Sequence, residues 1–172
     1  MDFEAALGEI GTWLEGRHRW AVVGGLGLAA YGLARTTLDL DIAVDAAAQD
    51  ALIARLEGLG YRTLHRSSGY SNHLHDSSAR GRVDIVYVAG ETADRLFGEA
   101  RRFPGPGGRD VPVPRPEHLA AMKALSIKND PDRVLRDLED VRFLLSLPGV
   151  DREEVRRHFE RYGLLEKFRA IE

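Results

Sequence analysis

The sequence contains no cysteine, and none of its apolar stretches approaches the roughly 20 residues that span a bilayer. The first absence excludes disulfides and thiolate metal sites. Asp2, Glu4 and Glu9 stand among the first apolar residues, which is the wrong chemistry for a secretory signal. We therefore expect a cytoplasmic protein that has no membrane partner.

An excess of one charge is also missing. Lys and Arg number 24 against 27 Asp and Glu, which gives a net charge of -3. This balance argues against bulk, non-specific binding to nucleic acid or to anionic membranes, although a local basic face is still compatible with it. Four arginines border a turn-rich stretch at 102–109, and we interpret them as a solvated loop, with an electrostatic grip on RNA as the alternative. They are Arg101, Arg102, Arg109 and Arg115.

The spacing of apolar residues predicts an α+β fold, in which helices flank a mixed β-sheet and a helical tail follows. At 172 residues, 44% of them hydrophobic, the chain fits one compact unit. We expect a nucleotide-handling α/β core at 1–112 and a helical region at 113–172 packed on it, with 102–109 as the nearest approach to a linker. Helices are predicted at 2–16, 26–33, 47–59, 92–100, 116–128, 130–147 and from 151. Strands are predicted at 20–23, 38–44, 61–65, 70–76 and 82–88.

The strand at 38–44 carries the first chemical signal. Its alternation places Leu38, Leu40 and Ile42 on a buried face, with Asp39 and Asp41 together on the other. Residues two apart on a strand lie about 6.5–7 Å apart, so the two carboxylates repel each other unless a cation separates them. Ligand sets made only of oxygen suit Mg²⁺ or Mn²⁺ better than Zn²⁺.

Asp84 is a third carboxylate, and it emerges from a very apolar strand opposite Val83 and Ile85. If this strand lies beside the Asp39 strand, three carboxylates converge, as in sites that hold two metal ions and accept a proton from an attacking hydroxyl. An Asp-x-Asp pair alone is more often the solvated face of a sheet. Asp84 shifts the balance towards a site.

Gly24 and Gly25 end a short apolar strand and open an apolar helix. Such a turn lets backbone N–H groups approach phosphate oxygens closely. A glycine pair at a strand end is usually only a tight turn, and this one fits neither a dinucleotide fingerprint nor a P-loop.

Together these residues resemble the core of the DNA polymerase β-like nucleotidyltransferase superfamily. The shared pattern is a strand ending in Gly24-Gly25, a short helix, then Asp39-Leu40-Asp41 on the next strand. The lead-in at 35–37, the helix at 116–123 and the Arg-Asp run at 136–140 resemble the abortive-infection toxin type of minimal nucleotidyltransferase most closely.

The resemblance implies transfer of a nucleoside monophosphate from an NTP to an acceptor, with Mg²⁺ or Mn²⁺ as the cofactor. It assigns catalysis to Asp39, Asp41, Asp84 and Lys123, the metal to the three aspartates, and nucleotide binding to Gly24, Gly25, Arg35, Thr37 and Asp137. Lys123 would neutralise charge that develops on phosphate. The acceptor would be RNA, such as tRNA, or a protein, and an antitoxin protein is a possible partner.

Plainer interpretations exist for several of these residues. Lys123 on an amphipathic helix is by default a solvated lysine. Arg133 with Asp137, and Arg136 with Asp140, are i,i+4 pairs that add about 0.3–0.5 kcal/mol each without any function. His73 and His75 share a strand face, which suits a transition metal, but polar hairpin residues are the simpler interpretation.

Two further functions compete with a toxin. The first is the same chemistry on a small molecule, as in aminoglycoside or lincosamide nucleotidyltransferases. The second is a non-catalytic nucleotide-binding module that has kept the fold, although no residue of the predicted site is missing.

Overall fold

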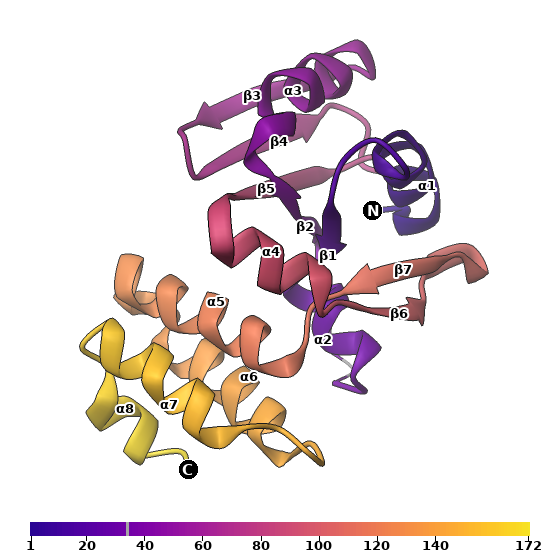
Figure 1. Ribbon diagram of the computed structural model, residues 1–172. Coiled ribbons are helices and arrows are strands. Elements are labelled where there is room, and N and C mark those ends of the chain that lie inside the picture. The colour runs from indigo at the N-terminus through magenta and orange to yellow at the C-terminus, as the bar shows by residue number, and fades with distance from the viewer. Residues whose placement is uncertain (34) are drawn as a thin grey trace. The chain divides into compact units, whose positions relative to one another are not determined.

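The structure is a computed structural model that describes residues 1–33 and 35–172 (Figure 1). The chain forms two compact units, Met1–Pro114 and Arg115–Glu172. The division falls two residues beyond the boundary expected at 112/113. Each unit has its own helices, and the first contains both β-sheets.

A five-stranded sheet forms the centre of the first unit, in the order β1-β2-β5-β4-β3. β2 and β5 pair in parallel, and every other pairing is antiparallel. β2 and β5 are inner strands, and Leu40, Ile42, Val83 and Ile85 on them are fully buried. The strands are β1 (Trp20–Val22), β2 (Asp39–Asp45), β3 (Tyr61–Arg66), β4 (Tyr70–His75) and β5 (Arg82–Val88).

The helices of this unit follow their apolar spacing. α1 begins after Asp2, whose carboxylate accepts from the backbone N–H of Ala5, and it buries Leu7, Ile10 and Leu14. α2 is short, and three of its seven residues are glycines, which disfavour a helix. The helices are α1 (Phe3–Leu14), α2 (Gly24–Ala30), η1 (Ala46–Ala48), α3 (Gln49–Gly58) and α4 (Gly90–Gly98).

The stretch at 102–109 is a β-hairpin, so its interpretation as a linker or solvated loop is wrong. β6 (Arg101–Pro104) and β7 (Asp110–Val113) pair antiparallel around the short η2 (Pro106–Gly108). Gly107 and Gly108 have φ values of 70° and 73°, which glycine adopts without strain. The turn formers therefore mark the tip of a hairpin.

The second unit is wholly helical. α5 starts at Pro116, whose missing N–H costs nothing in a first turn, and α7 starts after Asp151, whose carboxylate accepts from the N–H of Glu154. Phe159 and Phe168 lie in the core with ring centroids 5.5 Å apart. The helices are α5 (Pro116–Asn129), η3 (Pro131–Arg133), α6 (Val134–Ser146), α7 (Arg152–Arg161) and α8 (Leu165–Arg169).

The predicted α+β class, with a mixed sheet, flanking helices and a helical C-terminal stretch, is confirmed. One residue of the strand pattern is wrong: Leu38 precedes β2 and is 78% exposed, because the pairing of β2 with β5 starts only at Asp39. Among the described residues no helix is long and apolar enough to cross a membrane.

Candidate active site

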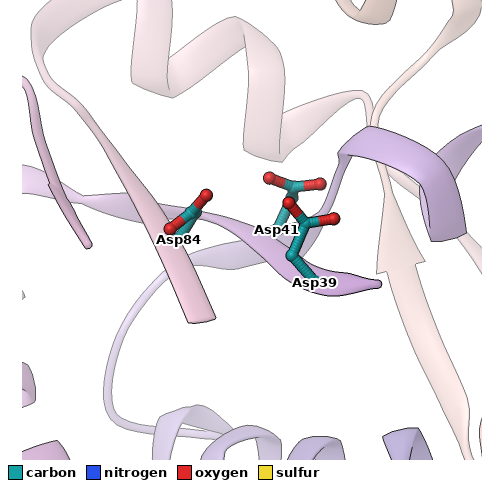
Figure 2. A group of neighbouring side chains, drawn as sticks. All are labelled: Asp39, Asp41 and Asp84. Atoms are coloured by element: carbon teal, nitrogen blue, oxygen red, sulfur yellow. The ribbon is translucent and has the colours of Figure 1, made fainter. Parts of the chain in front are cut away.

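The three predicted aspartates converge on one face of the sheet (Figure 2). In the parallel register of β2 and β5, Asp41 lies opposite Asp84, and Asp39 lies opposite Arg82. One carboxylate oxygen from each aspartate lies within 4.8 Å of those of the other two, and all three residues are half-buried. The sequence predicted that the three carboxylates converge if the strands of Asp39 and Asp84 are neighbours. The structure meets this condition.

Gly24 makes room for Asp41. A Cβ built on Gly24 would lie 1.9 Å from Oδ2 of Asp41, and the φ of Gly24 is 56°. Both the space and the backbone angle therefore require glycine here, beside the acidic cluster.

Gly25 makes room for Thr37 in the same way. A Cβ on Gly25 would lie 2.6 Å from the Thr37 Cβ and 2.7 Å from its hydroxyl. That hydroxyl donates to the Asp39 carboxylate at 3.0 Å. The glycine pair, Thr37, Asp39 and Asp41 therefore form one packed group, which brings together five of the predicted nucleotide-binding and catalytic positions.

Two further side chains hold Asp84. Arg82 Nε lies 2.8 Å from Oδ1 and 3.0 Å from Oδ2, and Asn72 donates to Oδ1 from β4 at 2.8 Å. The hydrogen bond to Asp84 raises the pKa of Arg82, although partial burial opposes this, and Asp39 and Asp41 raise it further through their charge. Arg82 is thus a cation that acts on all three carboxylates.

The cluster fits a divalent cation. Its donors are carboxylate oxygens alone, which are the ligands that Mg²⁺ and Mn²⁺ prefer. The three oxygens already lie close enough to share an ion, and the absence of a side chain at Gly24 leaves room for the Asp41 carboxylate among them.

Lys123 and Asp137 lie in the second unit and contact each other there. Lys123 is only 7% exposed, so its interpretation as a solvated lysine is wrong. Its Nζ lies 2.9 Å from Asp137 and 2.7 Å from Asp140, and Arg133 donates to Asp137 at 3.2 Å. Burial alone raises the pKa of Asp137, but the ion pair with Lys123 and further hydrogen bonds outweigh it, so the net shift is downward.

Sequence reasoning missed three residues of these groups. Arg82 was detectable, because a residue two positions before Asp84 shares its strand face. Asn72 needed the register of β4 against β5, which the sequence does not state. Asp140 was interpreted as a surface partner of Arg136, yet it is 2% exposed and lies beside Lys123.

The remaining predicted positions are Arg35 and the two histidines of β4. Arg35 lies in the connection between α2 and β2 and is half-buried. His73 is fully buried and has Ser71 at 2.8 Å and Thr63 at 3.2 Å as neighbours, whereas His75 accepts from the N–H of Ser77. The two histidines thus face different partners, which favours the simpler interpretation over a shared transition metal.

The arginines around the β6–β7 hairpin also have protein partners. Arg102 contacts Glu15 at 3.1 Å, Arg109 donates to Thr12 at 2.6 Å, and Arg115 contacts Glu154 at 3.0 Å. These contacts hold the three arginine side chains against the protein, which argues against their binding RNA.

The fold is similar to those of several solved structures, some of which are named as nucleotide-transferring enzymes. The antibiotic-resistance factor ANT(2'')-Ia matches with a TM-score of 0.71 and 19% identity over 99% of both chains. The lincosamide antibiotic adenylyltransferase LnuA matches with a TM-score of 0.55 and 21% identity over 83% of this chain and 96% of its own. The protein TM1012 of Thermotoga maritima matches with a TM-score of 0.57 and 18% identity, over 77% and 89% of the two chains.

At these identities the likeness shows a nucleotidyltransferase fold. The family follows from the sequence itself. Residues 12–168 match the model of the family described as nucleotidyl transferase AbiEii toxin, type IV toxin–antitoxin system, and the chain belongs to it. No curated protein sequence matches the chain. The predicted superfamily is confirmed, and the chain is a nucleotidyltransferase.

Proposed function

We propose that the protein transfers a nucleoside monophosphate from an NTP to a hydroxyl or phosphate of an acceptor, with Mg²⁺ or Mn²⁺ as the cofactor. The observation that carries this proposal is the convergence of Asp39, Asp41 and Asp84 within 4.8 Å on a nucleotidyltransferase fold. Three carboxylates this close are costly, and a divalent cation is the partner that reverses the cost.

In this proposal Asp39 and Asp41 hold the metal, and Asp84 completes the ligand set. When bound, the metal supplies positive charge that neutralises the triphosphate and polarises the reacting phosphoryl group. Asp84 is also the group placed to accept the proton of an attacking hydroxyl. Thr37 keeps the Asp39 carboxylate oriented through its hydrogen bond.

The nucleotide would lie along the glycine pair. Gly24 and Gly25 open α2 and would offer their backbone N–H groups to phosphate oxygens, and Arg35 supplies positive charge in the connection that follows this helix. Lys123 is proposed to neutralise charge on phosphate, with Asp137 orienting it. Since two aspartates now hold Lys123, a phosphate would have to compete with them for its ammonium group.

The favoured acceptor is a macromolecule, either RNA such as tRNA or a protein. The support is the family, which is that of a type IV toxin–antitoxin system and implies an antitoxin partner. A toxin acts by modifying a component that its host cannot do without, and both RNA and proteins offer free hydroxyl groups.

The test uses purified protein with each α-labelled NTP in turn, Mg²⁺ or Mn²⁺, and total tRNA or a cell extract. We expect label in RNA or protein with one or more NTPs, and none with Asp39→Ala plus Asp41→Ala. The matched control is Asp76→Ala, an aspartate whose side chain is 84% exposed in the turn after β4. Absence of transfer from every NTP to every acceptor would overturn the proposal.

A small-molecule acceptor is the second candidate. The fold matches ANT(2'')-Ia over nearly the whole of both chains, and a crystal structure of that protein holds adenylyl-2''-tobramycin. A host expressing this chain would then tolerate more aminoglycoside or lincosamide than a host expressing the Asp39→Ala, Asp41→Ala variant. If the two hosts are equally susceptible and the first test labels RNA, the acceptor is a macromolecule.

A further inference from the structure

Arg82 and Asp84 form an ion pair within the acidic cluster. They lie two residues apart on β5 and therefore share a strand face. The Arg82 Nε approaches both oxygens of Asp84, at 2.8 and 3.0 Å. A carboxylate whose two oxygens both contact a cation is a weaker ligand for an incoming metal ion than a carboxylate without such a partner.

The two members of this pair differ in exposure. The side chain of Asp84 is 19% exposed, whereas that of Arg82 is 46% exposed. Asp84 is also anchored by Asn72 on β4, which donates to Oδ1 at 2.8 Å. Asp84 is thus the fixed partner, and Arg82 is the one with room to leave towards solvent.

The charge of Arg82 reaches beyond Asp84. In the parallel register of β2 and β5, Arg82 lies opposite Asp39, and Asp84 lies opposite Asp41. A positive charge in this position relieves the mutual repulsion of the three aspartates. It also lowers the attraction that they exert on a divalent cation.

We propose that Arg82 is the internal counter-cation of the metal site and competes with a divalent cation for Asp84. Metal binding to the nucleotide-free protein is then weak, because the ion must displace Arg82 from at least one carboxylate oxygen. This inference rests on the proposed metal site and adds to it a residue that controls when the site is loaded. An NTP that binds together with its own metal ion supplies the additional attraction that displaces Arg82 from Asp84.

A purely structural role for Arg82 predicts the opposite sign. If Arg82 only orients Asp84, its removal leaves the carboxylate less well placed and weakens metal binding. If Arg82 competes with the metal, its removal strengthens binding. The direction of the change therefore separates the two roles without any measurement of transfer.

The experiment titrates the nucleotide-free protein with Mn²⁺ alone and measures free Mn²⁺ by electron paramagnetic resonance. We expect Arg82→Met to lower the Kd for Mn²⁺ at least fivefold, and Arg82→Gln to do the same if the methionine variant folds poorly. Adding Asp84→Asn to Arg82→Met should abolish the gain. The control is Arg62→Met on β3, because Arg62 is exposed and pairs with Asp76 at 3.5 Å.

An unchanged or raised Kd in folded Arg82 variants would overturn the inference. If the wild type transfers label in the NTP assay while the Kd stays unchanged in the variants, only the role of Arg82 fails. If neither the wild type nor the variants bind Mn²⁺ and no transfer occurs, the proposed function fails with it.

Discussion

Gly24 lies so close to Asp41 that a methyl group does not fit between them: a Cβ at position 24 would be 1.9 Å from the Asp41 Oδ2. The turn at the end of β1 and the carboxylate on β2 therefore constrain each other. The glycine is dictated by the acidic group rather than by the turn alone.

The first prediction concerns this contact. Gly24→Ala should displace the Asp41 carboxylate and lower transfer at least 100-fold, and the left-handed backbone should cost about 1–2 kcal/mol of unfolding free energy. Gly90→Ala is the matched control, since Gly90 has φ 59° but nothing within 4 Å of a built Cβ. Urea unfolding should show the backbone cost in both variants and a larger loss for Gly24→Ala, whose Cβ also meets Asp41, with transfer lost only in this variant. Equal transfer by the two variants would contradict the role of Gly24.

The second prediction concerns repulsion within the cluster. Asp39→Asn removes one of three neighbouring carboxylates, so the metal-free variant should be more stable than the wild type by about 1 kcal/mol, which is about 2–4 °C in Tm. Mn²⁺ should raise the Tm of the wild type and not that of the variant. Thermal melts with and without Mn²⁺ in the presence of ATP would measure both effects. A lower Tm for the metal-free variant would show that the hydrogen bond from Thr37 outweighs the repulsion.

The fold and the cluster on β2 and β5 could be predicted because their signals are local. Alternation with period two placed Asp39 and Asp41 on one face of their strand and Asp84 opposite the apolar face of its own, and the buried positions of Leu40 and Ile42 agree. Alternation does not state where a strand stops. Leu38 continues the pattern but has no pairing partner, and it lies exposed.

What the sequence missed depends on pairing across the chain. Asn72 reaches Asp84 only through the antiparallel register of β4 and β5. Asp140 meets Lys123 because α5 and α6 pack together, whereas the i,i+4 rule considers one helix at a time. The β6–β7 hairpin was hidden because its strands are four residues long and its turn is rich in glycine and proline.

The third prediction concerns Lys123. Lys123→Met would leave Asp137 and Asp140 buried without their shared cation, and removing one partner of a buried ion pair costs about 3–5 kcal/mol. Lys128 on the same helix is exposed, and its Nζ lies 5.4 Å from the centroid of the Tyr162 ring, so Lys128→Met should cost less than about 1 kcal/mol. Adding Asp137→Asn and Asp140→Asn to Lys123→Met should restore at least half of the loss. Urea unfolding measures all of these variants, and a loss below 1 kcal/mol for Lys123→Met would refute the pairing.

The fourth prediction concerns His73 and pH. Burial lowers the pKa of His73 from its ordinary 6.5, although Glu57 and Asp84 oppose this through their charge. The unfolded chain therefore takes up a proton below pH 6.5 that the folded protein does not, so stability should fall as the pH drops below 6.5. One proton contributes at most about 1.4 kcal/mol per pH unit, and the loss levels off once the folded His73 is protonated as well. The lowered pKa of Asp137 acts in a separate window, because its contribution is present above 3.8 and is lost as the pH falls below that value.

His73→Gln isolates this contribution. The variant should be less stable at pH 7.5, because it loses the fit to Ser71 and Thr63, but its stability should fall less steeply between pH 6.5 and 5.5 than that of the wild type. His65→Gln serves as the control, because His65 is exposed and stacks on Tyr70 with ring centroids 4.6 Å apart. Unfolding free energies at four pH values between 7.5 and 5.5 give the slopes. If His73→Gln keeps the wild-type slope, the acid sensitivity arises elsewhere, and burial of a neutral His73 is not its cause.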